Sequence, residues 1–236
     1  MKRFVIIMAV IAASLLTAGA QSVRNSRFYN PNTGRLDYSR TSRPTGRHSR
    51  YAYYPNAYYG LRVGPSFTSV ISDSPFLDGG GVTTGLNVGV VAGFEMIPAS
   101  SIFFETGLNY TEKGGKGKVG GDKFSYNLNY LELPLTLKYI APIDRGVTIQ
   151  PFIGGYVAAG VGGKIKDYGS RTAYSSFGDG IDQFKRFDGG LRLGCGLGMD
   201  MFYAELGYEL GLANVGQDDF DDTRNSALML TLGLNF

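Results

Sequence analysis

The sequence of 236 residues contains no tryptophan, one histidine and one cysteine. A disulfide needs two cysteines, so a sequence with Cys195 alone cannot form an intramolecular disulfide. One histidine and one cysteine supply no ligand set for zinc, iron or copper, and we expect no metal site and no cofactor. A hydrolase that relies on a histidine base would have to use His48, which lies in an arginine-rich segment. We therefore predict that the protein is not an enzyme and has no catalytic residues.

Glycine and two aromatic residue types are plentiful instead, with 35 glycines, 16 tyrosines and 15 phenylalanines. Glycine is a poor helix former, whereas tyrosine and phenylalanine pack well on the pleated surface of a sheet. This composition favours an all-β fold.

Residues 1–20 have the layout of a secretory signal peptide. A basic start at Lys2 and Arg3 precedes an apolar run from Phe4 to Leu16, and Ala18-Gly-Ala20 has the small-residue pattern of a cleavage site. A transmembrane anchor is the alternative, but the apolar run is shorter than the roughly 20 residues that a helix needs to cross hydrocarbon. We predict an exported protein.

Residues 21–57 have a different chemistry, with a single acid, Asp37, and neither helical nor strand periodicity. The segment carries seven arginines: Arg24, Arg27, Arg35, Arg40, Arg43, Arg47 and Arg50. We interpret it as a disordered, flexible basic arm. Arginine interleaved with tyrosine is also typical of segments that bind nucleic acid, but an exported protein is not expected to meet that partner. A periplasmic protein partner or anionic lipid headgroups are the alternatives that remain.

From Tyr58 to the last residue, 58–236, apolar residues recur at every second position. This period of two predicts strands with one apolar and one polar face. Eight segments show it: one from Tyr58 to the loop that begins at Ile71, then Thr83 to Ile97, Ser101 to Thr111, Tyr130 to Ile140, Val147 to Gly162, Phe187 to Met199, Phe202 to Ala213, and Ser226 to Phe236.

The connections between these segments alternate between short and long. The long ones are Ile71 to Val82, Glu112 to Lys123, Gly163 to Lys185, and Asn214 to Asn225. Short turns at one end and long loops at the other are typical of outer-membrane barrels. We predict an eight-stranded antiparallel transmembrane up-and-down β-barrel in the outer membrane of a Gram-negative bacterium, with both termini periplasmic and outer-membrane lipid around it.

The polar faces of the predicted strands carry nine charged residues, which we predict to form a charge network in the lumen: Arg62, Glu95, Glu105, Glu132, Lys138, Asp188, Arg192, Glu205 and Glu209. A lipocalin-type barrel or a β-sandwich would turn its apolar faces inward, and so many charges do not suit a dry core. The charges fit either a conducting pore or an ion-paired plug. Because eight strands leave little interior space, we favour the plug.

Several segments resemble the PorT-like outer-membrane β-barrel family of Bacteroidota. The most specific is Asn129-Tyr-Leu-Glu-Leu-Pro134, and Leu108-Asn-Tyr110, Pro151-Phe-Ile-Gly-Gly-Tyr156, Phe187-Asp-Gly-Gly-Leu-Arg-Leu-Gly194 and Tyr208-Glu-Leu-Gly-Leu212 are also similar to it. The resemblance implies a barrel fold and an outer-membrane location. The founding member of the family is linked to protein secretion across the outer membrane, but most relatives have no assigned role, so secretion is only the alternative function here.

Two functions stay open at this point. The first is a non-enzymatic structural or interaction barrel with a plugged lumen. It would use its external loops, chiefly Gly114 to Lys118 and Tyr168 to Phe184 with the aromatic rings of Tyr168, Tyr174 and Phe177, together with the periplasmic arm. The second is an accessory of protein secretion or a small narrow channel.

Two smaller features complete the set of candidate sites. The terminal aromatic Phe236 resembles the signal that the barrel assembly machinery recognises, so we predict that this machinery is a partner during biogenesis. An aspartate cluster, Asp218, Asp219, Asp221 and Asp222, fits a solvated acidic loop better than a calcium site because it lacks the spacing of an EF-hand.

Overall fold

The computed structural model describes residues 29–30, 35–36, 57–72, 81–96, 100–119, 122–144, 146–167, 172–178, 180, 183–217 and 222–236. Every regular element among them is a strand. They are β1 (Tyr29–Asn30), β2 (Arg35–Leu36), β3 (Ala57–Ser72), β4 (Thr83–Glu95), β5 (Ile102–Val119), β6 (Asp122–Tyr139), β7 (Ala141–Asp144), β8 (Val147–Gly162), β9 (Lys164–Asp167), β10 (Tyr174–Ser175), β11 (Phe187–Met199), β12 (Phe202–Gly211) and β13 (Thr223–Asn235). No helix in this part of the chain is long and apolar enough to cross a membrane.

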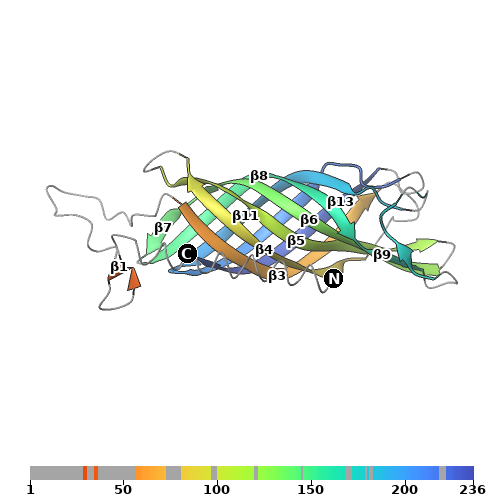
Figure 1. Cartoon of the computed structure of the whole chain (residues 1–236), viewed down its shortest axis with the longest axis horizontal. Helices are drawn as coiled ribbons and strands as arrows, with labels where there is room; N and C mark the ends of the chain where they lie inside the picture. The colour runs from red at the N-terminus through yellow and green to blue at the C-terminus, as the bar shows by residue number, and fades with distance from the viewer. Residues whose placement is uncertain are drawn as a thin grey trace.

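Eight of these strands close into an antiparallel barrel, as Figure 1 shows. The order around it is β3, β4, β5, β6, β8, β11, β12 and β13, and β13 pairs with β3 to complete the circle. At this seam Phe236 and Tyr59 exchange two backbone hydrogen bonds, 2.7 and 3.1 Å between nitrogen and oxygen. The predicted fold class, an all-β eight-stranded antiparallel barrel, is confirmed.

The two faces of each barrel strand differ as the alternation predicts. On β11, Leu191, Leu193 and Leu197 are about half exposed on the outside, whereas Asp188 and Arg192 are buried inside. The other barrel strands repeat this arrangement, with leucine, valine and phenylalanine outward and threonine, asparagine or charged residues inward. The barrel is therefore apolar outside and polar inside, the reverse of a soluble barrel.

The third connection differs from the prediction. The segment Glu112 to Lys123 is not a long loop, because β5 and β6 continue through it and pair from Glu112–Asn129 to Val119–Asp122. Its glycines hid the alternation in the sequence. The connection that follows β8 contributes β9, which extends the free edge of β6 beyond the barrel (Figure 1), and β10, which pairs with β9.

Inward-facing glycines make room for tyrosine and phenylalanine rings. A Cβ on Gly93 would come within 2.2 Å of the Tyr58 ring, and one on Gly196 within 2.5 Å of the Tyr203 ring. The interior of a narrow barrel has little space for side chains, so each large ring needs a small residue next to it. The abundance of glycine in this sequence has this packing as one cause.

The predicted signal peptide lies outside the described residues. Within the predicted basic arm, 21–57, the structure describes the two short strands β1 and β2, which pair with each other, and Ala57, the first residue of β3. The barrel begins with β3 at Ala57.

A charge placed on the outer face tests the direction in which the strands point. Leu193 lies at the middle of β11 and Met199 at its end, and both side chains are about half exposed. We expect Leu193→Arg to lower the free energy of unfolding in lipid vesicles by about 2–4 kcal/mol, and Met199→Arg by about 0–1 kcal/mol, because burying arginine costs most at the middle of a bilayer. Urea unfolding monitored by circular dichroism measures both. Equal effects at the two positions would contradict a membrane-spanning outer face.

Candidate functional site

The middle of the lumen holds two linked clusters of buried charged side chains. Glu105 of β5 is the centre of the first. The Nζ atom of Lys138, on β6, lies 2.8 Å from both of its carboxylate oxygens, and Arg62 of β3 lies 3.4 Å from one of them. The hydroxyl of Tyr58 also donates to Glu105. One carboxylate thus holds two cations and a hydroxyl from two other barrel strands.

Lys113 of β5 is the centre of the second cluster. Its Nζ atom lies 2.9 Å from Glu209, 3.2 Å from Glu132 and 3.3 Å from Asp188, which belong to β12, β6 and β11. The ring of Tyr156 lies 4.0 Å from the same ammonium group. A single lysine therefore bridges strands on opposite sides of the lumen.

Arg192 and Glu205 link the two clusters. The guanidinium of Arg192 lies 2.8 Å from Glu205 and 2.9 Å from Glu209. Glu205 accepts a hydrogen bond of 2.6 Å from the Tyr203 hydroxyl, and that hydroxyl accepts one of 2.9 Å from Lys138. The charges consequently form one continuous network across the lumen.

The network balances charge closely, because four cations face five carboxylates: Arg62, Lys113, Lys138 and Arg192 against Glu105, Glu132, Asp188, Glu205 and Glu209. All nine side chains are less than one-tenth exposed. A buried charge is tolerated when partners offset its lost hydration, and each of these groups has at least one ion pair. Chemically, the arrangement can hold strands together and block the passage of ions.

Eight of the nine residues predicted for the lumen lie in this network, and Glu95 does not. Glu95 is opposite Phe103 and so in the inward register, but it lies at the end of β4 and is partly exposed. None of the ion pairs among the described residues includes it. Its place at the mouth of the barrel, where water is available, accounts for the difference.

Sequence reasoning missed Lys113, which has three carboxylate partners, as many as Arg192. It lies in the segment that was expected to be a loop. Counting on from Glu105 through Asn109 and Thr111 in steps of two reaches Lys113, so the inward register was readable. The glycines that follow, Gly114 and Gly115, were the misleading signal.

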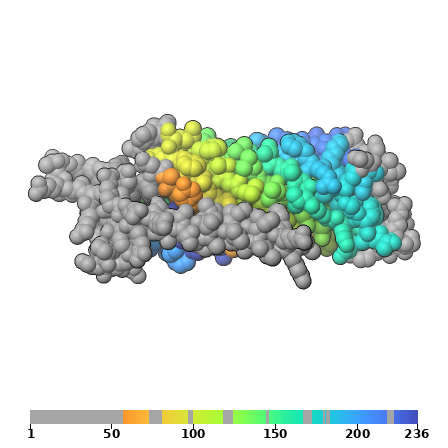
Figure 2. All heavy atoms as spheres, in the orientation of Figure 1, coloured from red at the N-terminus to blue at the C-terminus, as the bar shows by residue number. Residues whose placement is uncertain are grey.

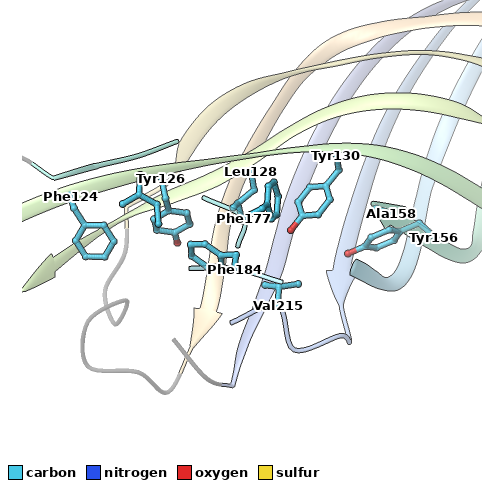
Figure 3. Packing of buried hydrophobic residues seen from close by; sticks show 10 residues of the cluster. Phe124, Tyr126, Leu128, Tyr130, Tyr156, Ala158, Phe177, Phe184 and Val215 are labelled. Atoms are coloured by element: carbon cyan, nitrogen blue, oxygen red, sulfur yellow. The ribbon is translucent and has the colours of Figure 1, made fainter. Parts of the chain in front are cut away.

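A cluster of aromatic and aliphatic side chains closes the lumen above the charges, at the end of the long connections. Figure 3 shows Phe177 and Phe184, from the connection between β8 and β11, packed among side chains of β6. The ring of Phe184 lies 5.0 Å from that of Tyr126, and the ring of Phe177 lies 5.5 Å from that of Tyr130. Backbone hydrogen bonds from Phe184 to Ser176 and from Lys185 to Val215 hold these segments in place.

This packing corrects one of the expected contact surfaces. Phe177 is 3% exposed and belongs to the closing cluster, and Tyr174 is partly buried against the same cluster, because both rings turn inward over the lumen. Tyr168 lies outside the described residues. The opposite end of the lumen has a smaller apolar cluster of Tyr58, Val91, Phe103 and Ile140.

A cavity of about 30 Å³ opens beside Lys113 between β3, β4, β5 and β6. A space of this size holds about one water molecule. Its lining is Thr68, Thr83, Thr84, Gly85, Glu112, Lys113 and Asn127. Nothing larger than water fits there.

The remaining candidate residues lie away from the lumen. Cys195 is exposed on the outer face of β11. Phe236 lies at the closing seam with Tyr59, and its role as an assembly signal stays a prediction. Of the aspartate cluster, Asp222 is described and exposed, and the other three residues lie outside the described part of the chain.

Comparison with known proteins gives a family. Residues 48–217 match the family model of the outer membrane protein beta-barrel domain. No curated protein matches the sequence.

Similar solved structures include the attachment invasion locus protein Ail of Yersinia pestis in complex with the heparin analogue sucrose octasulfate. Ail is 17% identical with a TM-score of 0.42, and the match covers 77% of this chain and 100% of Ail. A major outer membrane protein of Thermus thermophilus is 14% identical with a TM-score of 0.48, covering 76% and 99%. OprG of Pseudomonas aeruginosa is 13% identical with a TM-score of 0.43, covering 76% and 96%.

Removing Lys113 tests whether the network stabilises the barrel. We expect Lys113→Met to lower the free energy of unfolding in neutral detergent micelles by about 3–5 kcal/mol. Without Lys113, Glu132 and Glu209 keep only Arg192 as a cation, and Asp188 keeps only hydrogen-bond donors. Lys116→Met is the matched control, since Lys116 is on the same strand but exposed, and its effect should stay within about 0.5 kcal/mol.

A second substitution distinguishes lost charge balance from lost packing. Adding Glu132→Gln to Lys113→Met removes one of the carboxylates left without its lysine, so the double variant should recover part of the lost stability. Guanidinium unfolding curves measure all the variants. Additive losses in the double variant would show that the two side chains act independently.

Proposed function

The chain belongs to the outer membrane protein β-barrel domain family, and from this premise we propose that it is a closed barrel with a structural or interaction role rather than a channel or an enzyme. The family is one of outer-membrane barrels, which fits the apolar outer face of the strands. The observation that carries the proposal is the filled lumen, where nine paired charges lie between two clusters of buried apolar side chains.

The ion pairs support closure over conduction. A selectivity filter needs charges that can exchange partners with a passing ion. Here each carboxylate of the network already holds a lysine or arginine at 2.8–3.4 Å. An ion that entered would have to break these pairs and then displace Phe177 and Phe184. The proposed barrel therefore separates the two sides of the membrane.

The same pairs support a non-enzymatic role. General acids and bases act through groups that are free to exchange a proton with a substrate. The carboxylates of the network are enclosed by cations, hydroxyls and apolar rings, and the cavity beside Lys113 has room for about one water molecule. Interaction with other molecules then falls to the outer surfaces, chiefly the end where β9, β10 and the long β5–β6 hairpin lie.

In the proposed orientation the end of the barrel with the long connections lies outside the cell, and the end with the short connections and Phe236 lies in the periplasm. The short connections at one end and the extended hairpin at the other support this orientation, because barrels of this class have short periplasmic turns and longer external loops. Protease treatment of intact cells, followed by mass spectrometry of the fragments, tests it. Cleavage in 168–186 agrees with the proposal, and cleavage only between β4 and β5 contradicts it.

Planar-bilayer recording tests whether the lumen is closed. We expect no reproducible single-channel steps from the refolded full chain, because the paired charges and the rings of Phe177 and Phe184 fill the path. A porin of known conductance in the same chamber is the positive control. Steps that disappear in Glu105→Ala or Arg192→Ala but persist in Leu191→Ala, whose side chain faces outward, would overturn the closed-lumen proposal.

A further inference from the structure

The outer face of the sheet formed by β5, β6 and β9 carries a group of lysines, here called the lysine face. It comprises Lys116 on β5 and Lys164 and Lys166 on β9, and all three side chains are exposed. Lys116 and Lys166 are both opposite Ser125, one on each side of β6. Three lysines therefore share one face of three adjacent strands.

The side chains of this face are accessible, and none of the ion pairs among the described residues includes them. Lys116, Lys164 and Lys166 are exposed. The outward positions described beside them on β6 are Ser125 and Asn127, and Lys164 is opposite Ser175. Glu112, the next acid along β5, accepts hydrogen bonds from the Tyr110 hydroxyl and the Leu86 backbone nitrogen. Within the part of the chain that the structure describes, no carboxylate neutralises the positive charge of this face.

Opposite charges directly across a sheet stabilise it. Lys116 and Lys166 are both opposite Ser125, and Lys164 is opposite Ser175, so these lysines gain no such pair from their sheet neighbours. The inward face of the same hairpin, with Phe124, Tyr126 and Leu128 buried, supplies its stability instead. The lysines therefore contribute little to folding and are available to a ligand of opposite charge.

The position of the lysine face selects the kind of ligand. On the outer surface of β8, Val157 and Val161 are 40% and 48% exposed, and Lys164 follows Val161 by three residues. Three residues span at most about 10 Å, and a lysine side chain can reach back along an apolar surface to a charged layer. The apolar face and the lysines point outward on a continuous surface, so a molecule that touches the lysines lies beside the barrel.

We propose that the lysine face binds the phosphate groups of anionic lipids in the leaflet that surrounds this end of the barrel. The inference rests on the proposed membrane-spanning barrel, because it needs the Val157 and Val161 surface to face lipid. A soluble polyanion would meet the end of the barrel first, whereas these lysines face sideways. Figure 1 shows β9 on the flank of the long hairpin, and Figure 2 shows the segment that contains it on the visible surface of the molecule.

Native mass spectrometry of the full chain in neutral detergent micelles tests the proposal. The probes are phosphatidic acid, phosphatidylcholine as the neutral lipid, and heparin as a soluble polyanion. We expect phosphatidic acid to bind and phosphatidylcholine not to. The double variant Lys116→Gln with Lys166→Gln should bind phosphatidic acid about tenfold more weakly, because the loss of each lysine removes part of the attraction to an anionic surface and should weaken binding about threefold. Added salt should weaken binding to the natural sequence more than to the variant.

The matched control is Lys185→Gln with Arg224→Gln. It removes the same charge from two exposed side chains that lie at this end of the molecule but off the lysine face. Its affinity for phosphatidic acid should stay within about twofold of the natural sequence. An equal loss in both double variants, or no loss in either, overturns the proposal, and lysine-dependent binding of heparin without binding of phosphatidic acid assigns the face to a soluble polyanion instead.

Heat-dependent gel mobility verifies that each variant is folded. If the double variant does not fold, the single variants Lys116→Gln and Lys166→Gln should each weaken binding about threefold, and unchanged affinity in both would contradict the proposal. Conductance is a separate readout on the same protein. A conducting barrel that binds phosphatidic acid through these lysines overturns the closed lumen alone, and a closed barrel that does not bind it overturns the lysine face alone.

Discussion

The closed ladder of backbone hydrogen bonds is the constraint on which the rest of this structure depends. In hydrocarbon an unpaired backbone group costs several kcal/mol, so a sheet can cross a membrane only if its last strand pairs with its first. Here β13 pairs with β3, and Phe236 and Tyr59 complete the seam. Closure with eight strands fixes a narrow interior, and that interior must then be filled by side chains from every strand.

The narrow lumen explains why charges and glycines occur together on the inward faces. Lysine, arginine and glutamate are long enough to meet across the barrel, and Lys113 and Arg192 each reach carboxylates on several strands. Tyrosine rings from Tyr58 and Tyr203 fit only because Gly93 and Gly196 lack side chains. Ion-paired side chains and packed aromatic rings together fill the narrow lumen.

The end of the barrel with the long connections has a buried core of its own. Beyond the charge network, Phe177, Phe184 and Val215 fold back over the lumen and give the long connections a buried core of their own. This core lets the β5–β6 hairpin extend past the barrel with β9 on its edge, and it leaves the outer face of the hairpin free to carry lysines. The filled lumen and the apolar outer face are consequences of one alternating pattern, whose inward residues pack against one another and whose outward residues form the outer surface.

The alternation in the sequence was enough to predict the all-β class, eight barrel strands, the apolar outer face and eight members of the charge network. This succeeded because a period of two assigns each residue to a face before any contact is known. The sequence did not indicate that β5 and β6 continue to Val119 and Asp122, that Lys113 lies at the centre of a cluster, or that Phe177 turns inward. These features depend on partners far apart in the chain, such as Glu209 for Lys113 and Tyr130 for Phe177. The sequence by itself determined which face each residue occupies, and only the tertiary structure decided which residues meet across the lumen, because strand register and barrel closure bring them together.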